Sequence, residues 1–199
     1  MSDVNNYTDK WNSMLVLGIG NVLLQDEGIG IHILKFMEKH FPTFPDVTYK
    51  DGGTLSFTLA SAIEEHDHLL VLDAVELNAP PGTLCCYENE AMDHFLGTAK
   101  RSAHEVGLLD LMDIARLSGH LPKRRALIGM QYGTFDWGEE PTPQVKENIP
   151  LAGRVAATLL QKWELEEHPP CGKTAPKLEV IYGSHYRRRA TTRTWRFTA

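Results

Sequence analysis

Short apolar runs alternate with longer stretches of helical periodicity along most of this chain. The runs occupy residues 14–19, 47–51, 68–75, 83–88 and 125–130. A continuous apolar run such as HLLVLDAV is typical of a strand buried on both faces. Because strands and helices alternate, the sequence predicts an α/β fold in which helices cover both faces of a mainly parallel sheet. In such sheets, functional groups gather beyond the carboxyl ends of the strands.

The segments between these runs have apolar residues at helical spacing. The first helix is expected to begin near Gly28 and to end before the prolines at 42 and 45. Thr54 is expected to cap a second helix. Pro150 lies within the last helical segment and is expected to bend or interrupt it. The remaining helices are expected at residues 89–96, 102–119 and 143–166.

Charge separates the C-terminal part of the chain from the rest. Residues 168–199 hold seven Lys and Arg residues and one Glu, although the net charge of the whole chain is −6. A chain of 199 residues can form one domain with a substantial core. We therefore expect a flexible N-terminal segment (1–13), a single acidic α/β domain (14–167) and a basic, loosely ordered C-terminal extension (168–199).

Composition argues against several classes of partner. An acidic domain does not favour nucleic acid, since phosphate binding needs clustered Lys and Arg. No apolar run approaches the roughly 18 residues of a membrane span. The polar N-terminus carries acidic residues early and is unlike a secretory signal. The expectation is a cytoplasmic protein that binds neither nucleic acid nor membrane.

The glycine-rich stretch LGIGNVLLQDEGIG (17–30) follows the first predicted strand and resembles a nucleotide-binding loop only in part. Leu23 stands where the GxGxxG motif requires its third glycine, and no Gly-Lys-Ser/Thr follows. Asp26 and Glu27 would place negative charge where a phosphate would bind. No nucleotide cofactor is therefore expected, and the glycines are interpreted as a tight strand-to-helix turn.

Four polar residues are expected at the carboxyl ends of the strands. Glu27 belongs to an acidic pair that could equally complement a helix dipole, for ~0.3–1 kcal/mol each. Asp73 interrupts a buried run, where a carboxylate needs a metal, water or backbone N–H groups. Asp51 precedes two glycines and could be an ordinary turn residue. His104 is expected in a loop just before a helix, where it could face the same edge.

If Glu27, Asp73 and His104 converge, they form a two-carboxylate, one-imidazole set. Such a set suits zinc or nickel, with coordination left open for substrate. Spacing along the chain does not establish convergence, and a lone loop histidine is more often structural than a ligand. The sequence contains no HExxH helix and no GxSxG elbow. His66 and His68, at the start of the third predicted strand, are expected to be solvated.

Several separated motifs nevertheless occur in one order between residues 14 and 165. Together they resemble the nickel–iron hydrogenase maturation endopeptidase family. The resemblance implies a three-layer α/β/α sandwich. It also implies a peptidase that removes a C-terminal extension from the hydrogenase large-subunit precursor after nickel insertion, with the bound nickel as recognition mark. The motifs are LGIGNVLLQDEGIG, DGGT (51–54), LLVLDAV (69–75), PPGTL (80–84), SAHEVGL (102–108) and ALIGMQ (126–131).

The resemblance assigns roles to individual positions. It implies that three residues contact the nickel that the precursor cysteines already hold, and that three others recognise the substrate. Whether a carboxylate or the metal activates water stays open. The metal-contacting and catalytic residues are Glu27, Asp73 and His104, and the recognition residues are Asp51, Gly52 and Gly53.

Two departures from the family pattern and two alternative functions accompany this hypothesis. His104 is followed by Glu105, where the family often has glutamine. The basic C-terminal extension is longer than the family pattern requires; it could contact the precursor, accompanying maturation proteins or neither. The alternative functions are a self-contained metallopeptidase or amidase, and a nickel checkpoint that binds the precursor without cutting it.

Overall fold

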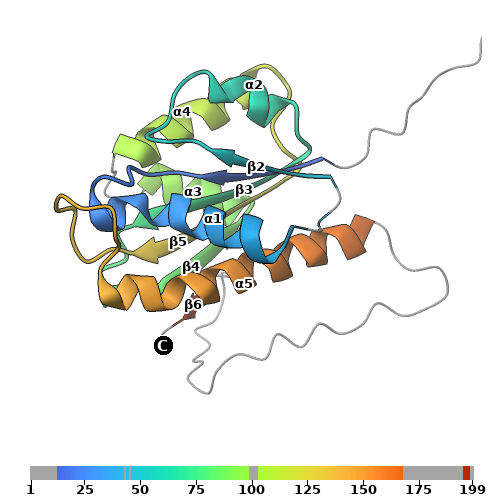
Figure 1. Ribbon diagram of the computed structural model, residues 1–199. Helices are drawn as coiled ribbons and strands as arrows, with labels where there is room; N and C mark the ends of the chain where they lie inside the picture. Colours follow the sequence, from blue (N-terminus) through green and yellow to red (C-terminus); the bar gives the residue numbers. More distant parts are fainter. Residues whose placement is uncertain (1–12, 43, 45, 99–102, 168–194, 198–199) are drawn as a thin grey trace, which may run out of the picture.

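The computed structural model describes residues 13–42, 44, 46–98, 103–167 and 195–197 (Figure 1). Strands and helices alternate over most of this length, as the sequence predicts. The elements are β1 (Met14–Gly18), the 3₁₀ helix η1 (Gln25–Gly28), α1 (Ile29–His40), β2 (Val47–Asp51), α2 (Leu59–Glu64), β3 (His68–Val75), β4 (Leu84–Glu88), α3 (Glu90–Thr98), α4 (Ala103–Leu117), β5 (Arg124–Gln131), α5 (Pro143–Glu167) and β6 (Trp195–Phe197).

The described strands form one sheet in the order β2-β1-β3-β5-β4-β6. β2, β1, β3 and β5 are parallel, whereas β4 runs antiparallel to both β5 and β6. The parallel strands therefore all end at the same edge of the sheet, which we call the carboxyl edge. The predicted mainly parallel α/β fold is confirmed.

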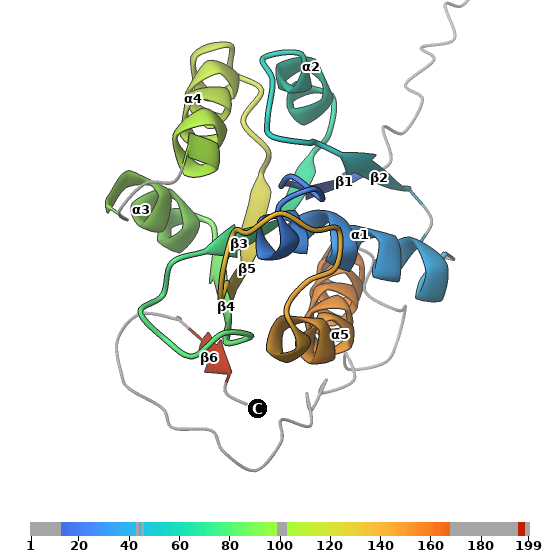
Figure 2. The ribbon, with the colours of Figure 1, turned by 60° about the vertical axis from the view of Figure 1, so that its left-hand side comes forward.

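Helices cover both faces of the sheet and complete a single-domain, three-layer α/β/α sandwich (Figure 2). Leu70 and Leu72 of β3 pack into the core shared with α1 and α5. Leu69 and Val71, on the opposite face, pack into the core shared with α2, α3 and α4. Because both faces of β3 are buried, all its residues are sheltered, and this explains its continuous apolar run. Within the described residues, no helix combines the length and apolar character needed to cross a membrane.

Two helices differ from the prediction. α2 begins at Leu59 rather than after Thr54, because Leu55 has a positive φ of 68° that a helix cannot contain. α5 is not interrupted at Pro150, so of the two expected outcomes, a bend or an interruption, the interruption does not occur. The proline removes the helical donor of the Lys146 carbonyl group, but Lys146 is exposed, so water can hydrate that carbonyl.

His68 is buried, which contradicts the expectation that it is solvated. It lies at the start of β3 beneath α5, where its ring centroid is 5.6 Å from that of Trp163. Its Nε2 is 3.7 Å from Oε1 of Glu167, at the end of the same helix. Burial lowers the pKa of His68, and the nearby Glu167 opposes that effect.

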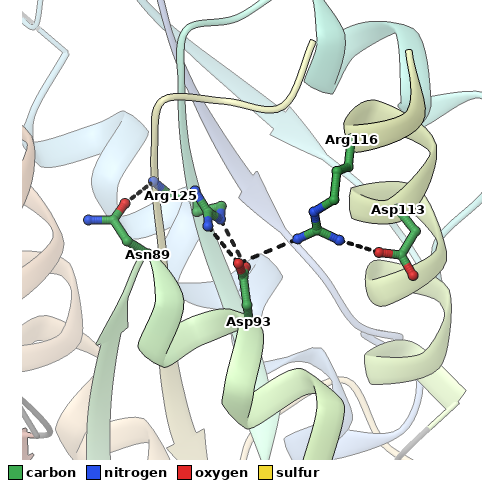
Figure 3. A network of polar contacts seen from close by, with 5 residues as sticks. All are labelled: Asn89, Asp93, Asp113, Arg116 and Arg125. Carbon is green, nitrogen blue, oxygen red and sulfur yellow. Dashed lines mark hydrogen bonds and ion pairs between the residues drawn. The ribbon is translucent and has the colours of Figure 1, made fainter. Parts of the chain in front are cut away.

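An ion-pair network joins α3, α4 and β5 at the edge opposite the carboxyl edge (Figure 3). Asp93 of α3 accepts hydrogen bonds from Nε (2.8 Å) and Nη2 (2.5 Å) of Arg125, at the start of β5. Arg116 of α4 pairs with Asp93 at 3.4 Å and also with Asp113. The bonds to Asp93 raise the pKa of the nearly buried Arg125. The network fixes two helices to the sheet at a distance from the candidate site.

Three residues of the predicted C-terminal extension are part of the sheet. Trp195, Arg196 and Phe197 pair with the side of β4 that faces away from β5, so that β6 covers an otherwise unpaired edge of that strand. Within the expected C-terminal extension, these are the residues that the structure describes, and they belong to the sheet. Residues 1–12 and 168–194, which include most of the two predicted terminal segments, lie outside the described part of the chain.

Candidate functional site

Backbone hydrogen bonds bring the loops after β1 and β2 together at the carboxyl edge, beside the end of β3. Gly52 N donates to Gly18 O at 2.8 Å, and Gly20 N donates to Gly53 O at 2.8 Å. Ile19 N donates to Leu72 O at 2.9 Å, which links the first loop to β3 just before Asp73. The segments that contain Glu27, Asp51 and Asp73 therefore meet at one edge.

The glycines of the first loop permit close backbone packing. Gly20 has a φ of +140°, and a Cβ atom there would lie 2.0 Å from the carbonyl oxygen of Glu27. A Cβ atom on Gly30 would lie 2.1 Å from Leu72 O and 2.3 Å from Ile19 O. The start of α1 therefore packs directly against the ends of β1 and β3. This geometry agrees with the interpretation of a tight strand-to-helix turn.

Asp26 is fully buried and holds the loop between β5 and α5, a role that the sequence did not reveal. Its Oδ1 accepts a hydrogen bond from Thr142 N at 2.7 Å. Its Oδ2 accepts bonds from Gly133 N (2.8 Å), Thr134 N (3.3 Å) and the Thr142 hydroxyl (2.8 Å). These four donors offset the cost of burying a carboxylate. No signal near Asp26 points to donors more than 100 residues further along the chain.

Glu27 follows this buried aspartate directly in η1 and is only partly buried. Its backbone N donates to Leu24 O at 3.0 Å. The hydrogen bonds to the Asp26 side chain and the close packing of Gly20 against the Glu27 carbonyl group hold the backbone at Glu27. The structure thus places this carboxylate-bearing position at the carboxyl edge on a backbone held by its neighbours, as a role in binding or catalysis requires.

Asp73 lies in β3 and is 1% exposed. Its Oδ1 accepts a hydrogen bond from Ala74 N at 2.8 Å. This is the kind of backbone contact by which a carboxylate at a strand end can be purely structural. Asp73 nonetheless follows Leu72, which bonds to the loop after β1, so its backbone adjoins the turn that leads to Glu27.

Asp51 is exposed at the end of β2, and its Oδ1 accepts a hydrogen bond from Gly53 N at 2.9 Å. This contact forms the turn that the sequence suggests for Asp-Gly-Gly. Gly52 packs against Leu17, where a Cβ atom would come within 2.9 Å of its side chain. Gly53 has a φ of +51°, and the space beside its Cα is open. The turn therefore presents backbone at the carboxyl edge.

His104 lies within the first turn of α4, not in a loop before a helix as predicted. Its side chain lies outside the described part of the structure. Gly107, one helical turn further on, packs near Leu55, with a distance of 3.3 Å from its Cβ position to Leu55 Cδ1. The beginning of α4 therefore adjoins the loop that follows Asp51, Gly52 and Gly53.

The structure describes the side chains of Glu27 and Asp73 but not that of His104, the third residue of the predicted metal-binding set. Among the side chains that the structure describes, no three His, Cys, Asp or Glu groups are arranged to hold a metal ion. The His104 imidazole does not belong to those side chains. The convergence of Glu27, Asp73 and His104 on one metal therefore remains a prediction, and the backbones of all three adjoin loops of the carboxyl edge.

Comparisons with known proteins point to one family. Residues 31–159 match the family model described as hydrogenase maturation protease. The chain is 36% identical to the hydrogenase expression/formation protein HupD of Rhizobium leguminosarum bv. viciae, over 89% of this chain and 90% of that protein. It is 37% identical to the hydrogenase 2 maturation protease of Escherichia coli K12, over 73% of this chain and 90% of that protein.

Solved structures agree with this similarity. The hydrogenase maturating endopeptidase HybD from E. coli superposes with a TM-score of 0.71 at 32% identity, over 76% of this chain and 93% of that one. HybD from Thermococcus kodakarensis superposes with a TM-score of 0.64, over 74% of this chain and 99% of that one. Its identity of 24% supports the fold alone.

Proposed function

Because the chain belongs to the hydrogenase maturation protease family and is a peptidase, we propose that it removes the C-terminal extension of a nickel–iron hydrogenase large-subunit precursor. In this proposal the cut follows nickel insertion, takes place in the cytoplasm and uses the bound nickel as its recognition mark. The precursor is the protein partner, and the peptidase carries no nucleotide.

The observation that carries the proposal is the junction at the carboxyl edge between the loop after β1 and the end of β3. Ile19 N donates to Leu72 O at 2.9 Å, so the turn that leads to Glu27 adjoins Asp73. Carboxylate oxygens and an imidazole nitrogen are suitable ligands for a borderline divalent ion. A pair of carboxylates at a fixed edge, near the start of the helix that carries His104, would engage nickel that arrives with the precursor.

Each predicted residue then has a task in hydrolysis. Glu27, Asp73 and His104 contact the nickel and so position the scissile bond beside the carboxyl edge. The exposed turn at Asp51 contacts the precursor, and the open backbone at Gly53 leaves room for a peptide to approach. Water is the nucleophile, as hydrolysis requires. Either one of the carboxylates or the nickel, which is cargo of the precursor, would activate that water.

The experiment is an incubation of the purified protein with nickel-loaded and with nickel-free precursor, followed by mass spectrometry of the precursor. We expect the nickel-loaded precursor to lose one C-terminal peptide and the nickel-free precursor to stay intact. Equal cleavage of both, together with stoichiometric zinc in the purified protein, would instead indicate a self-contained metallopeptidase. Formation of a stable complex with no change in mass would indicate a nickel checkpoint.

A further inference from the structure

Exposed apolar side chains gather where the loop after β1 meets the loop between β5 and α5. Leu23 is 49% exposed, Phe135 39% and Trp137 83%. Gly138 N donates to Leu23 O at 3.0 Å, and Gln25 N donates to Gly138 O at 2.7 Å. The two loops thus lie next to each other and form an isolated parallel bridge between Leu24 and Gly138. In Figure 2 the loop between β5 and α5 passes in front of the start of α1. We call Leu23, Phe135 and Trp137 the loop surface.

Hydrogen bonds to a buried carboxylate hold the segment that carries Phe135 and Trp137. The buried Asp26 carboxylate binds Gly133, Thr134 and Thr142, at the two ends of the segment that presents Phe135 and Trp137. The Phe135 ring also packs on the Tyr132 ring, with 4.2 Å between the centroids. Exposed apolar side chains on neighbouring loops are typical of sites of protein interaction, and Trp is enriched among the residues that dominate binding at such sites.

The loop surface adjoins the candidate site. Gln25, which binds Gly138, is two residues before Glu27 in the same short helix. A polypeptide whose scissile bond lies at Glu27 would therefore pass over or beside the loop surface. By contrast Leu117, another exposed apolar residue, lies at the far end of α4, away from the carboxyl edge.

Charge indicates what kind of segment fits. Residues 133–141 contain Asp136, Glu139 and Glu140 and no Lys or Arg. Glu140 is paired with Lys146, the distance from its Oε2 to Nζ being 2.5 Å. Asp136 and Glu139 lie in sequence on either side of Trp137 and are both exposed. A complementary partner presents an apolar side chain next to a Lys or Arg.

We propose that the loop surface binds the precursor segment next to the scissile bond, through an apolar residue packed against Trp137 and Leu23 and a Lys or Arg beside Asp136 and Glu139. This inference rests on the proposed function and adds a specificity-determining surface to it. The nickel contact selects precursors that are ready for cleavage, and the loop surface selects the peptide.

The test measures kcat and KM for cleavage of the nickel-loaded precursor by the full chain and by its Trp137→Ser variant. The matched control is Leu117→Ser, which also replaces an exposed apolar residue (89% exposed). We expect Trp137→Ser to raise KM at least about tenfold with kcat nearly unchanged, as loss of a binding hot spot does. Leu117→Ser should leave both constants unchanged. Circular dichroism of each variant establishes that it is folded.

A second experiment tests whether the negative charges of Asp136 and Glu139 contribute to precursor binding. The double variant Asp136→Asn, Glu139→Gln should raise KM several-fold and make KM less dependent on salt concentration, since it removes attraction to a basic group. Replacement of Lys and Arg by Gln near the cleavage point of the precursor should have the same effect on the wild-type enzyme. When the enzyme double variant is combined with the precursor variants, the increases in KM should not be additive.

Other outcomes would overturn the inference. An unchanged KM for Trp137→Ser, with efficient cleavage by the wild-type protein, rejects the loop surface and leaves the proposed function intact. A lowered KM indicates that the chain's own basic extension covers the surface. A change only in self-association, measured by sedimentation velocity, indicates a second copy of the chain. If the wild-type protein neither binds nor cleaves the precursor, the proposed function itself fails.

Discussion

The Asp26 carboxylate accepts hydrogen bonds from both the backbone N (2.7 Å) and the hydroxyl (2.8 Å) of Thr142, 116 residues further along the chain. This contact ties the turn before Glu27 to the residue that precedes α5. It keeps two loops of the carboxyl edge in one arrangement. The carboxylate beside Glu27 is therefore structural, and only Glu27 of the acidic pair remains a candidate for substrate contact.

We expect Asp26→Asn to lower the free energy of unfolding by roughly 2–4 kcal/mol, because the amide directs an N–H group at some of the four donors that the carboxylate satisfied. Urea unfolding followed by circular dichroism measures this. Thr142→Val is the matched control: it removes one hydroxyl donor and should cost about 1 kcal/mol. If the free energy of unfolding of Asp26→Asn lay within about 0.5 kcal/mol of the wild-type value, the structural role assigned to the Asp26 carboxylate would be contradicted.

Glu27→Gln, Asp73→Asn and His104→Ala should each reduce the rate of precursor cleavage by at least about a hundredfold, because each removes a proposed contact to nickel. Each variant should keep the wild-type circular dichroism spectrum. Glu38→Gln, an exposed carboxylate on the far part of α1, should process the precursor normally. Normal cleavage by any one of the three variants would remove that residue from the site. Single-turnover mass spectrometry provides the rates.

Two glycine-to-alanine changes should have opposite effects on stability. A Cβ atom on Gly30 would lie 2.1 Å from Leu72 O, so Gly30→Ala must separate α1 from β3 and should cost more than about 3 kcal/mol. Gly97, in α3, has no atom within 4 Å of its Cβ position. Gly97→Ala should therefore stabilise the protein by about 0.5–1 kcal/mol through helix propensity. Thermal and urea unfolding of both variants test this contrast.

The polar network in Figure 3 predicts unequal effects for its two arginine contacts. Asp93→Ala leaves the Arg125 guanidinium, which is only 10% exposed, without its two hydrogen bonds and should cost about 3 kcal/mol or more. Arg116→Ala breaks a pair at a half-exposed position and should cost less than about 1 kcal/mol. Urea unfolding of both single variants and the double variant measures the difference. Equal losses would show that burial of Arg125 is unimportant.

Stability should fall as the pH decreases below the ordinary pKa of histidine, in part because of His68. Burial, and to a lesser extent Arg124, lowers the pKa of His68, although Glu167 opposes this shift. The unfolded chain therefore takes up a proton near the ordinary histidine pKa of 6.5, while folded His68 stays neutral to lower pH. Unfolding is then favoured as the pH falls from about 7.5 to about 5.5.

His68→Phe keeps a ring beside Trp163 and removes this titration. Its free energy of unfolding should depend less on pH over that range than that of the wild type. Part of the dependence should remain, because burial also lowers the pKa of His32. Urea unfolding at several pH values provides the comparison. An identical pH dependence in the two proteins would contradict the assignment to His68.

Local patterns in the sequence predicted most elements of the fold. The apolar run at 68–75 gave the central strand because a strand covered on both faces needs apolar residues throughout. The same reasoning failed at Leu55, where a positive φ delays α2, and of the bend or interruption expected at Pro150 the interruption does not occur. These outcomes depend on how neighbouring segments pack, which spacing along one segment does not encode.

For the candidate site, residue patterns alone indicated the family, excluded a dinucleotide fingerprint, and predicted that Glu27, Asp51 and Asp73 lie at one edge of the sheet. The folded structure was needed to distinguish Asp26, whose buried carboxylate binds a distant loop, from Glu27, which is partly exposed. It also showed that Leu23 binds the backbone of Gly138, the residue after Trp137. The physical reason is that hydrogen bonds between residues more than 100 positions apart arise from the packing of whole loops, and no local pattern of residue types records them.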